Sequence, residues 1–368
     1  MAGLTAGPAG RSFLVAKDNL ADGQFADEQA ADAAALADGQ VLLKVDRFAF
    51  TANNITYAAF GEAMSYWRFF PAPEGKGNVP VWGFADVVAS RAEGLQPGER
   101  VYGYFPMSTH LVVEPVKMSA RGFTDGAAHR RGLPPVYNSY VRVAADPDYA
   151  PAHEAAQMLL RPLFMTSFLI DDFLADEDFF GAKAIVLSSA SSKTGMGLAF
   201  MLAHRSPRPA KIVGLTSPGN APFVRSLGWY DETVLYDDIG TLDKVPTVFV
   251  DFAGSAAVLT QVHTHLGDQL KHSCIVGASH WQERGTVHDL PGAKPVFFFA
   301  PSRIEKRHAD WGPGGLDKKV AAAWSAFISQ SQTWMKVCEH RGEADIAATY
   351  ANVLGGRVGA NEGHIIVL

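Results

Sequence analysis

Cysteine is scarce in this sequence, and long hydrophobic runs are missing from it. The 368 residues include only Cys274 and Cys338, which are too few for a disulfide framework or for a structural zinc site built on clustered cysteines. No apolar run approaches the roughly 20 residues that a membrane-spanning helix requires. Residues 1–11 lack the basic head and the apolar segment of a secretory signal. We therefore expect a soluble, cytoplasmic protein with no membrane partner.

An excess of charge of either sign is missing as well. The chain carries 32 Lys and Arg against 38 Asp and Glu, a formal net charge of -6, and its basic residues do not cluster. This excludes the basic footprint of a nucleic-acid-binding protein, so we expect no nucleic-acid partner. The hydrophobic fraction of 48% is that of a globular protein, and the length predicts two domains.

The residue pattern changes near residue 150. Before it, short alternating runs predict a mostly antiparallel β domain with strands at 12–15, 40–48, 79–90 (broken by Gly83) and 100–104. After it, a helical pattern over 153–174 leads into apolar β runs that alternate with helix-length segments, which is typical of a parallel sheet covered on both faces. Strands are predicted at 184–187, 211–216, 234–236, 247–251, 273–277 and 296–300, and helices at 195–203, 221–227, 256–266 and 316–329.

A loop of small residues, Ser188 to Gly197, joins the strand at 184–187 to the next helix. Such a loop before a helix N-terminus holds phosphate through backbone N–H groups, because little side-chain bulk stands in the way. The sequence has no G-x-G-x-x-G fingerprint, so a serine-rich turn that merely caps its helix is the alternative interpretation. The residues expected to contact a nucleotide here are Ser189, Ser191, Ser192, Lys193, Thr194 and Gly195.

Several segments, in the same order along the chain, resemble motifs of the medium-chain dehydrogenase/reductase superfamily. They are GQVLLKV at 39–45, TANNIT at 51–56, PGERV at 97–101 and the closing strand at 359–368. Segments at 66–71, 160–172 and 298–304 resemble its DUF2855 branch. The resemblance implies a β-rich, GroES-like catalytic domain over residues 1–155, a doubly wound (Rossmann) dinucleotide-binding domain over 156–310 and a return to the catalytic domain over 311–368. It also implies a homodimer formed at the edge of the nucleotide-binding sheet, near residues 296–299.

The resemblance implies a nicotinamide cofactor, and the strand after the loop indicates which one. In NAD-selective relatives that strand ends in an acidic residue that binds the ribose hydroxyls, whereas here it ends in Thr216 and Ser217. Their hydroxyls, together with Lys193 and Arg225, favour the 2′-phosphate of NADP(H). The ends of later strands line the cofactor crevice of a doubly wound sheet, and there we expect contacts from Phe252, Gly277 and Ala300.

The ligands of the superfamily's zinc-dependent members are missing. Where those enzymes carry a cysteine and a Gly-His-Glu motif, this chain has Phe50–Asn53 and Gly83–Ala85. The spacing of His263 and His265 suits neither one helix face nor a zinc pair. We therefore expect no metal site.

Without zinc, a side chain or water must protonate the product of hydride transfer. Tyr57 and Tyr66 are the candidate donors, and Asn54 is expected to orient the substrate or a loop. His280 and the segment Tyr137–Tyr140 are weaker candidates. Buried tyrosines with satisfied hydroxyls are nevertheless commoner than catalytic ones.

These expectations together predict a function class. We expect a zinc-independent, NADP(H)-dependent oxidoreductase that reduces a small apolar or aromatic substrate, an enone, a quinone or a carbonyl compound. The alternative is an inactive or non-redox member of the same fold, acting as a binding protein, a lyase or an isomerase.

Overall fold

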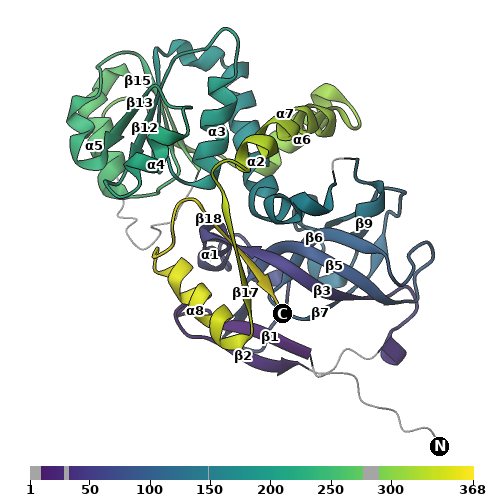
Figure 1. Ribbon diagram of the computed structural model, residues 1–368. Coiled ribbons are helices and arrows are strands. Elements are labelled where there is room, and N and C mark those ends of the chain that lie inside the picture. The colour runs from purple at the N-terminus through teal and green to yellow at the C-terminus, as the bar shows by residue number, and fades with distance from the viewer. Residues whose placement is uncertain (1–9, 29–32, 148, 277–289) are drawn as a thin grey trace, which may run out of the picture. The chain divides into compact units, whose positions relative to one another are not determined.

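The structure is a computed structural model that describes residues 10–28, 33–147, 149–276 and 290–368. The chain divides into two compact units (Figure 1): unit 1 comprises Met1–Leu159, Lys336–Val358 and Glu362–Leu368, and unit 2 comprises Leu160–Met335 and Gly359–Asn361. Unit 2 extends beyond the boundary that we expected at residue 310. The reason is that helix α7 (Gly315–Ser331) stacks its Phe327 on Phe164 of α2 (Glu154–Asp176).

Unit 1 is built on a nine-stranded sheet in the order β17-β18-β3-β5-β6-β10-β9-β8, with β7 paired to β3. Its pairings are antiparallel apart from that of β17 with β18, which confirms the predicted β domain. The strands are β3 (Val41–Phe50), β5 (Pro80–Ser90), β6 (Arg100–Pro106), β7 (His110–Val113), β8 (Pro115–Val116), β9 (Gly122–Asp125), β10 (Ser139–Arg142), β17 (Lys336–Arg341) and β18 (Glu362–Val367). A small sheet and the α-helices α1 and α8 also belong to this unit. Their bounds are β2 (Gly23–Glu28), β1 (Gly10–Ala16), β4 (Lys76–Asn78), α1 (Ala52–Ala59) and α8 (Glu343–Leu354).

Strand β5 corrects one expectation, the break at Gly83. The strand runs through Gly83 without interruption. A side chain at this position would clash with the carbonyl oxygen of Arg47 and with Phe48 on β3, which bulges between Val45 and Arg47. The glycine therefore allows two central strands to approach closely, which is a recognised use of glycine inside a strand.

Unit 2 contains a six-stranded parallel sheet in the order β13-β12-β11-β14-β15-β16. Numbered along the unit, this is the doubly wound order 3-2-1-4-5-6, in which a ligand crevice forms where the order reverses, beside the first and fourth strands. The strands are β11 (Ala184–Leu187), β12 (Lys211–Thr216), β13 (Glu232–Leu235), β14 (Thr247–Asp251), β15 (Leu270–Ile275) and β16 (Pro295–Phe297). Three of them, β11, β12 and β14, have the bounds that their apolar runs predict, and the predicted fold class is confirmed.

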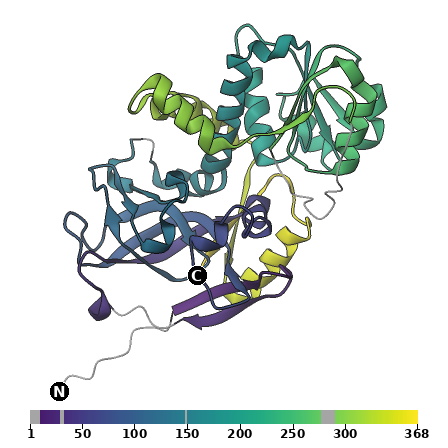
Figure 2. The same ribbon diagram turned by 180° about the vertical axis from the view of Figure 1, so that it is seen from behind.

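Helices lie on both faces of this sheet. The views in Figures 1 and 2 show α3 (Lys193–Ala203) and α5 (Ala256–Leu266) on opposite sides of it. Helix α5 forms because its apolar residues recur at helical spacing, and it buries them in one core; they are Val258, Leu259, Val262 and Leu266. The remaining helices are α4 (Ala221–Ser226) and α6 (Ala300–Trp311). Among the described residues, no helix is both long and apolar enough to cross a membrane.

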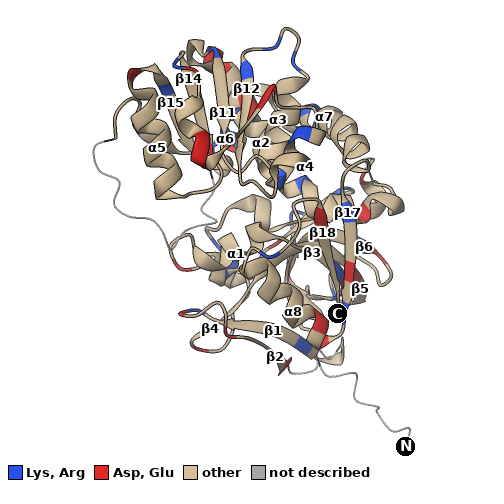
Figure 3. Ribbon diagram, turned by 60° about the vertical axis from the view of Figure 1, so that its left-hand side comes forward, with Lys and Arg blue, Asp and Glu red and all other residues tan. Residues whose placement is uncertain are grey.

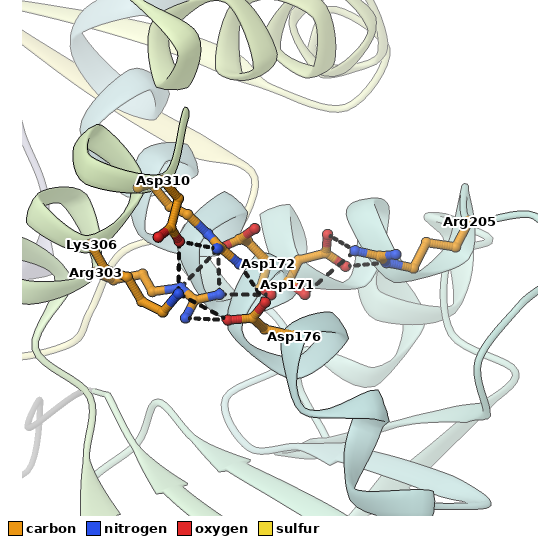
Figure 4. Close-up of polar contacts among 8 residues, drawn as sticks. Asp171, Asp172, Asp176, Arg205, Arg303, Lys306 and Asp310 are labelled. Atoms are coloured by element: carbon orange, nitrogen blue, oxygen red, sulfur yellow. Dashed lines mark hydrogen bonds and ion pairs between the residues drawn. The ribbon is translucent and has the colours of Figure 1, made fainter. Parts of the chain in front are cut away.

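Charged residues of both signs are interspersed along both units, as Figure 3 shows. One ion-pair network joins α6 to α2 (Figure 4). The Asp172 carboxylate binds both Arg303 and Arg307 at 2.6 Å, and Asp176 lies 3.0 Å from Arg303 and 2.9 Å from Arg307. Asp171 faces the other way in Figure 4 and pairs with Arg205 at 2.7 Å. Helix α2 is thereby tied to α6 and to the segment that follows α3.

Candidate functional site

The candidate cofactor site is the edge of the parallel sheet where β11 and β14 end side by side. Residues Ser188–Ser192, named the serine loop below, connect β11 to α3. Ser189 turns the chain with a positive φ of 48°. Ser192 is the N-cap of α3, and its hydroxyl accepts a hydrogen bond from the Gly195 N–H at 3.1 Å. The first-turn N–H groups of the helix therefore start directly at this edge, as in an anion-binding helix N-terminus.

Two tyrosines, one on either side of β13, hold the serine loop in place. The Tyr236 hydroxyl accepts a hydrogen bond from the Ser189 N–H at 2.9 Å, and the Tyr230 hydroxyl donates to the Ala190 carbonyl at 2.7 Å. Burial raises the pKa of both phenols, so both stay protonated at neutral pH. Because the Ser189 N–H is engaged within the fold, this group does not bind phosphate. The signal that the sequence offered for Tyr236 was its position as the last residue of the strand predicted at 234–236.

A buried hydrogen-bond lock joins the ends of β11 and β14. The Ser188 hydroxyl donates to Asp251 Oδ1 at 2.6 Å and accepts from the N–H groups of Phe252 (2.9 Å) and Ala253 (3.1 Å). Both Ser188 and Asp251 are fully buried. The lock brings Phe252 against the loop, because a Cβ on Gly195 would lie 3.5 Å from the Phe252 ring and 3.0 Å from the Ser189 carbonyl. The contact with the Ser189 carbonyl would be a tight one, so glycine at position 195 relieves crowding beside the loop.

Five of the predicted cofactor residues come together at this edge. Ser191, Lys193 and Thr194 are half-buried at the start of α3. Thr216, which is buried, and Ser217, which is half-buried, end β12 next to them. The end of β12 carries no acidic side chain at these two positions. Two other predicted residues, Ser189 and Ser192, hold the loop itself through the bonds described above.

The other predicted cofactor residues lie elsewhere or outside the described residues. Arg225 is exposed in the last turn of the short helix α4. Ala300 begins α6 and packs in an apolar cluster with Phe168 and Leu316. It comes after β16, the outer strand of the sheet, and two strands, β14 and β15, lie between β16 and β11. Ala300 therefore does not follow the strand beside the serine loop, and the cofactor contact of Arg225 stays a prediction. Gly277 lies outside the described residues.

Among the described residues, no group of three or more His, Cys, Asp or Glu side chains is arranged to hold a metal ion. The two histidines of α5 serve packing. His263 bridges the Ser273 hydroxyl (2.8 Å) and the Pro291 carbonyl (3.0 Å), and His265 contacts the Leu242 carbonyl at 2.8 Å. Burial lowers the pKa of His263, which keeps this bridging ring neutral.

Four tyrosine side chains converge in one cluster of unit 1, named the phenol cluster below. Tyr57 lies on α1, Tyr66 on the short turn Tyr66–Arg68, Tyr104 on β6 and Tyr137 on the turn Pro135–Tyr137. Ring centroids are 4.7 Å apart for Tyr57 and Tyr66, 5.7 Å for Tyr66 and Tyr137, and 4.9 Å for Tyr104 and Tyr137. The residues that pack around them include Phe69, Phe70, Trp82 and Leu133.

The hydroxyl groups of this cluster have few partners. Trp82 Nε1 donates to the Tyr57 oxygen at 3.4 Å, and the hydroxyls of Tyr66 and Tyr137 lie 3.4 Å apart. The Tyr104 hydroxyl is buried with no hydrogen-bond partner in the part of the chain that the structure describes. Burial raises the pKa of both Tyr57 and Tyr66, so each keeps its proton at neutral pH. The two predicted proton donors, Tyr57 and Tyr66, therefore lie in the same cluster. Tyr104 belongs to the cluster as well, although the sequence indicated it only as part of a strand.

Asn54, which was expected to orient the substrate or a loop, lies in the first turn of α1. Its Oδ1 accepts a hydrogen bond from the Thr51 N–H at 2.7 Å, and its Nδ2 donates to the Pro80 carbonyl at 2.9 Å. Thr51 and Asn54 together form the capping box of α1. Both ends of the amide are engaged, so Asn54 fixes α1 against β5. This geometry fits the loop-orienting role, and the substrate-orienting role stays a prediction.

The sequence matches the model of one protein family over residues 48–359, most of its length. That family is described as a protein of unknown function, DUF2855. The chain belongs to this family. The membership that segments 66–71, 160–172 and 298–304 predict is thereby confirmed. A search of curated proteins found no match to the chain.

Solved structures of reductases share the fold at low sequence identity. CurA from Vibrio vulnificus in complex with NADPH has a TM-score of 0.61 and 11% identity over 97% of this chain and 98% of CurA. The YhdH oxidoreductase from Salmonella enterica in complex with NADP has a TM-score of 0.54 and 11% identity over 97% and 99% of the two chains. A mutant form of enoyl thioester reductase from Candida tropicalis has a TM-score of 0.56 and 11% identity over 98% and 100%. The fold implied by the superfamily resemblance is thereby confirmed.

Proposed function

We propose that this protein is a zinc-independent, NADP(H)-dependent oxidoreductase that reduces a small apolar or aromatic enone, quinone or carbonyl compound. The observation that carries the proposal is the serine loop at the point where the strand order of the parallel sheet reverses. Dinucleotides bind at this point in doubly wound sheets. The relatives in fold that were solved with NADPH and NADP support the same conclusion.

The residues at this edge fit NADP(H). Thr194 offers a first-turn N–H and Ser191 a hydroxyl, groups that suit a pyrophosphate. At the end of β12, Thr216 and Ser217 offer hydroxyls and no carboxylate that would repel a 2′-phosphate. Lys193 adds a positive charge beside them. When bound, the cofactor would supply a hydride to the substrate.

The phenol cluster fits the proton-transfer half of such a reaction. Hydride addition to an enone or a carbonyl leaves negative charge on carbon or oxygen, which a neutral acid must quench. Tyr57 or Tyr66 donates its hydroxyl proton to that atom, because burial keeps both phenols neutral. The aromatic surroundings, Phe69 and Trp82 among them, favour an apolar substrate over a sugar or a phosphate ester.

Zinc independence rests on the side chains present in the chain. Phe50–Asn53 and Gly83–Ala85 offer neither a thiolate nor an imidazole where zinc-dependent relatives have them. Both cysteines, Cys274 and Cys338, are free thiols. Free thiols suit a reducing compartment, and we propose the cytoplasm.

The outer strand of the parallel sheet supports a homodimer. Strand β16 ends the strand order, and beside it the side chains of Val296, Phe297 and Phe299 are 54%, 50% and 40% exposed. An exposed apolar edge strand invites pairing with another chain. Phe297→Lys should convert a dimer to a monomer in light scattering, whereas Val88→Lys, at an exposed valine of β5, should not. A monomeric parent protein would refute the dimer.

The cofactor proposal is tested by titrating the protein with NADPH and NADH and following nicotinamide fluorescence or heat. We expect NADPH to bind more tightly. Ser217→Asp should weaken NADPH binding by roughly 10²-fold or more, because a carboxylate beside a 2′-phosphate costs several kcal/mol. It should leave NADH binding no weaker, since a carboxylate at this position can bind the ribose hydroxyls. Ser329→Asp, at an exposed position of α7, is the matched control. Failure to bind NADPH at high micromolar concentration would refute the proposal.

Turnover is tested separately with an enone, a quinone and an aldehyde of similar size, by following oxidation of NADPH. We expect the parent protein to reduce at least one of them and Tyr66→Phe or Tyr57→Phe to lose roughly 10²-fold or more in kcat, the usual contribution of a general acid. Binding of NADPH without turnover of any substrate would favour the non-redox alternative.

A further inference from the structure

A cavity of about 270 Å³ lies beside the outer strands of the parallel sheet in unit 2. His272 and Cys274 of β15 are two residues apart and therefore face the same side of the sheet. They line the cavity together with Phe173 of α2 and the segment Val296–Phe299. The serine loop follows β11, and β14 lies between β11 and β15. The cavity is therefore separate from the serine loop, and the proposed function leaves it without a role.

The imidazole of His272 is the main polar group in the wall of this cavity. It makes no hydrogen bond to the part of the chain that the structure describes. The Phe180 ring stacks on it, with centroids 4.2 Å apart and planes 1° from parallel, and the Phe173 ring lies 5.5 Å away. Burial lowers the pKa of His272, so the ring is neutral at neutral pH. A neutral imidazole has one donor and one acceptor, and here both are left for a ligand.

The turn that carries Phe180 has a strained backbone. Asp178, Phe179 and Phe180 have positive φ values of 46°, 49° and 53°. The left-handed conformation is unfavourable for each of them, because Cβ comes too close to the following carbonyl oxygen. Two contacts compensate, the Phe179 ring under the Arg205 guanidinium at 5.2 Å and the Phe180 stack on His272. Backbone strain of this kind clusters at ligand-binding sites, so the turn supports the cavity wall as part of a site.

The charged groups at the cavity favour an anionic ligand. Its described lining residues include two cationic side chains, Arg303 and Lys306, and no acidic one. Arg303 is buried and engaged with carboxylates of α2 (Figure 4). Lys306 is 49% exposed and lies 2.7 Å from Asp310 and 3.5 Å from Asp176. Because an ammonium group has three donors, Lys306 retains one for an anion, and Ser302, one helical turn before it, is exposed at the same rim.

We propose that this cavity binds a small aromatic carboxylate that carries a hydroxyl group. Its rings pack against Phe173 and the phenylalanines of the segment Val296–Phe299, its carboxylate binds Lys306, and its hydroxyl bonds His272. The volume is slightly below that of pockets for drug-sized ligands, so one or two rings fit. The site goes beyond the proposed function and does not depend on it. The dimer proposed above pairs the main chain of β16, whereas the floor of the cavity lies on a face of the sheet.

Three probes that differ by one group test the chemistry of the ligand, with calorimetry on the full chain. 6-Hydroxy-2-naphthoate should bind with a Kd of about 1 mM or lower, as expected for a ligand of this size. Loss of the carboxylate in 2-naphthol, or of the hydroxyl in 2-naphthoate, should each weaken binding by roughly fivefold. Equal affinity for 2-naphthol would overturn the carboxylate, and equal affinity for 2-naphthoate would overturn the role of His272.

The place of binding is tested by NMR of protein labelled with ¹³C-histidine. The ring signal of His272, assigned with His272→Phe, should move when 6-hydroxy-2-naphthoate is added, and NADPH should not reverse the shift. A probe that leaves this signal in place, or that NADPH displaces, would overturn a second site.

Two exposed positions give variants that should fold like the parent, which thermal unfolding checks. Ser302→Trp fills the cavity from its rim and should abolish probe binding, whereas Glu305→Trp, exposed on the same helix and outside the lining, should not. Lys306→Met should weaken 6-hydroxy-2-naphthoate by roughly fivefold and leave 2-naphthol unchanged. Lys318→Met, at an exposed position of α7, should change neither. Unchanged binding of 6-hydroxy-2-naphthoate by Ser302→Trp would overturn the site.

Discussion

The serine loop of unit 2 and the phenol cluster of unit 1 are built in opposite ways. The loop is held by main-chain groups and small hydroxyls, with Ser188 bonded at 2.6 Å to Asp251 and the Ser189 N–H bonded to Tyr236. The cluster is held by ring contacts and by the buried Asp125–Arg130 pair behind it. Its hydroxyl contacts are 3.4 Å long, and the Tyr104 hydroxyl has no partner among the described residues. A phosphate-binding edge requires rigid main chain, whereas a proton donor requires a hydroxyl that is not saturated by the protein.

The largest expected effect is a loss of stability when the buried Asp125–Arg130 ion pair behind the phenol cluster is broken. Asp125→Asn leaves the Arg130 guanidinium buried, with both side chains of the pair about 1% exposed, and without a counter-charge. This should cost about 3–5 kcal/mol in the free energy of unfolding. Near-ultraviolet circular dichroism of the tyrosines and tryptophan during urea unfolding reports it. NADPH affinity of the folded fraction should be unchanged.

The control for this variant is Glu62→Gln, which breaks the exposed ion pair with Lys17. Exposed pairs contribute at most about 1 kcal/mol, so this variant should unfold like the parent. Equal destabilisation in the two variants would contradict the support role of the buried pair. A loss of NADPH affinity in Asp125→Asn would break the contrast between the two regions.

The next effect concerns the lock of the serine loop. Ser188→Ala leaves the buried N–H of Phe252 without its acceptor and removes a donor from Asp251. We expect a loss of about 1–3 kcal/mol in stability together with weaker NADPH binding. Ser191→Ala is the matched control, since Ser191 is half-buried on the same loop; it should weaken NADPH binding and leave stability unchanged. A Ser188→Ala protein as stable as the parent would contradict the lock.

The same contrast explains what the sequence could predict. Strands β11, β12 and β14 and helix α5 have the bounds expected from local apolar patterns, and the serine loop was found because strand, loop and helix are adjacent in the chain. The Ser188–Asp251 bond joins residues 63 positions apart, so no local pattern predicts it. Tyr57 and Tyr66 lie on neighbouring segments of the sequence, and both could be named as candidate proton donors from it. Tyr104 reaches the cluster only through the packing of β6.

The role of Ser192 separates the two interpretations of the loop that the sequence left open. Ser192→Ala removes the N-cap bond to Gly195 and should cost about 1 kcal/mol. Ser192→Asp keeps a capping oxygen and should retain parent stability in thermal unfolding, but its charge should weaken NADPH binding by repelling phosphate. If Ser192→Asp binds NADPH as the parent does, the loop only caps its helix, and the cofactor edge lies elsewhere.

The smallest expected effect is a pH dependence of the stability that the ion-pair network between α2 and α6 contributes. This network is partly exposed, unlike the buried Asp125–Arg130 pair of unit 1. Hydrogen bonds from Arg307 and Arg303 lower the pKa of Asp176 to about 2 from an ordinary 3.8. A lowered native pKa contributes stability that is fully present above 3.8 and is lost as pH falls through about 2. Asp176→Asn should therefore be less stable than the parent near neutral pH, and the difference in urea midpoint should shrink toward zero between these two pH values. Asp178→Asn, at an exposed position two residues on, should match the parent throughout. A difference for Asp176→Asn that does not change with pH would mean that the network acts through packing and not through charge.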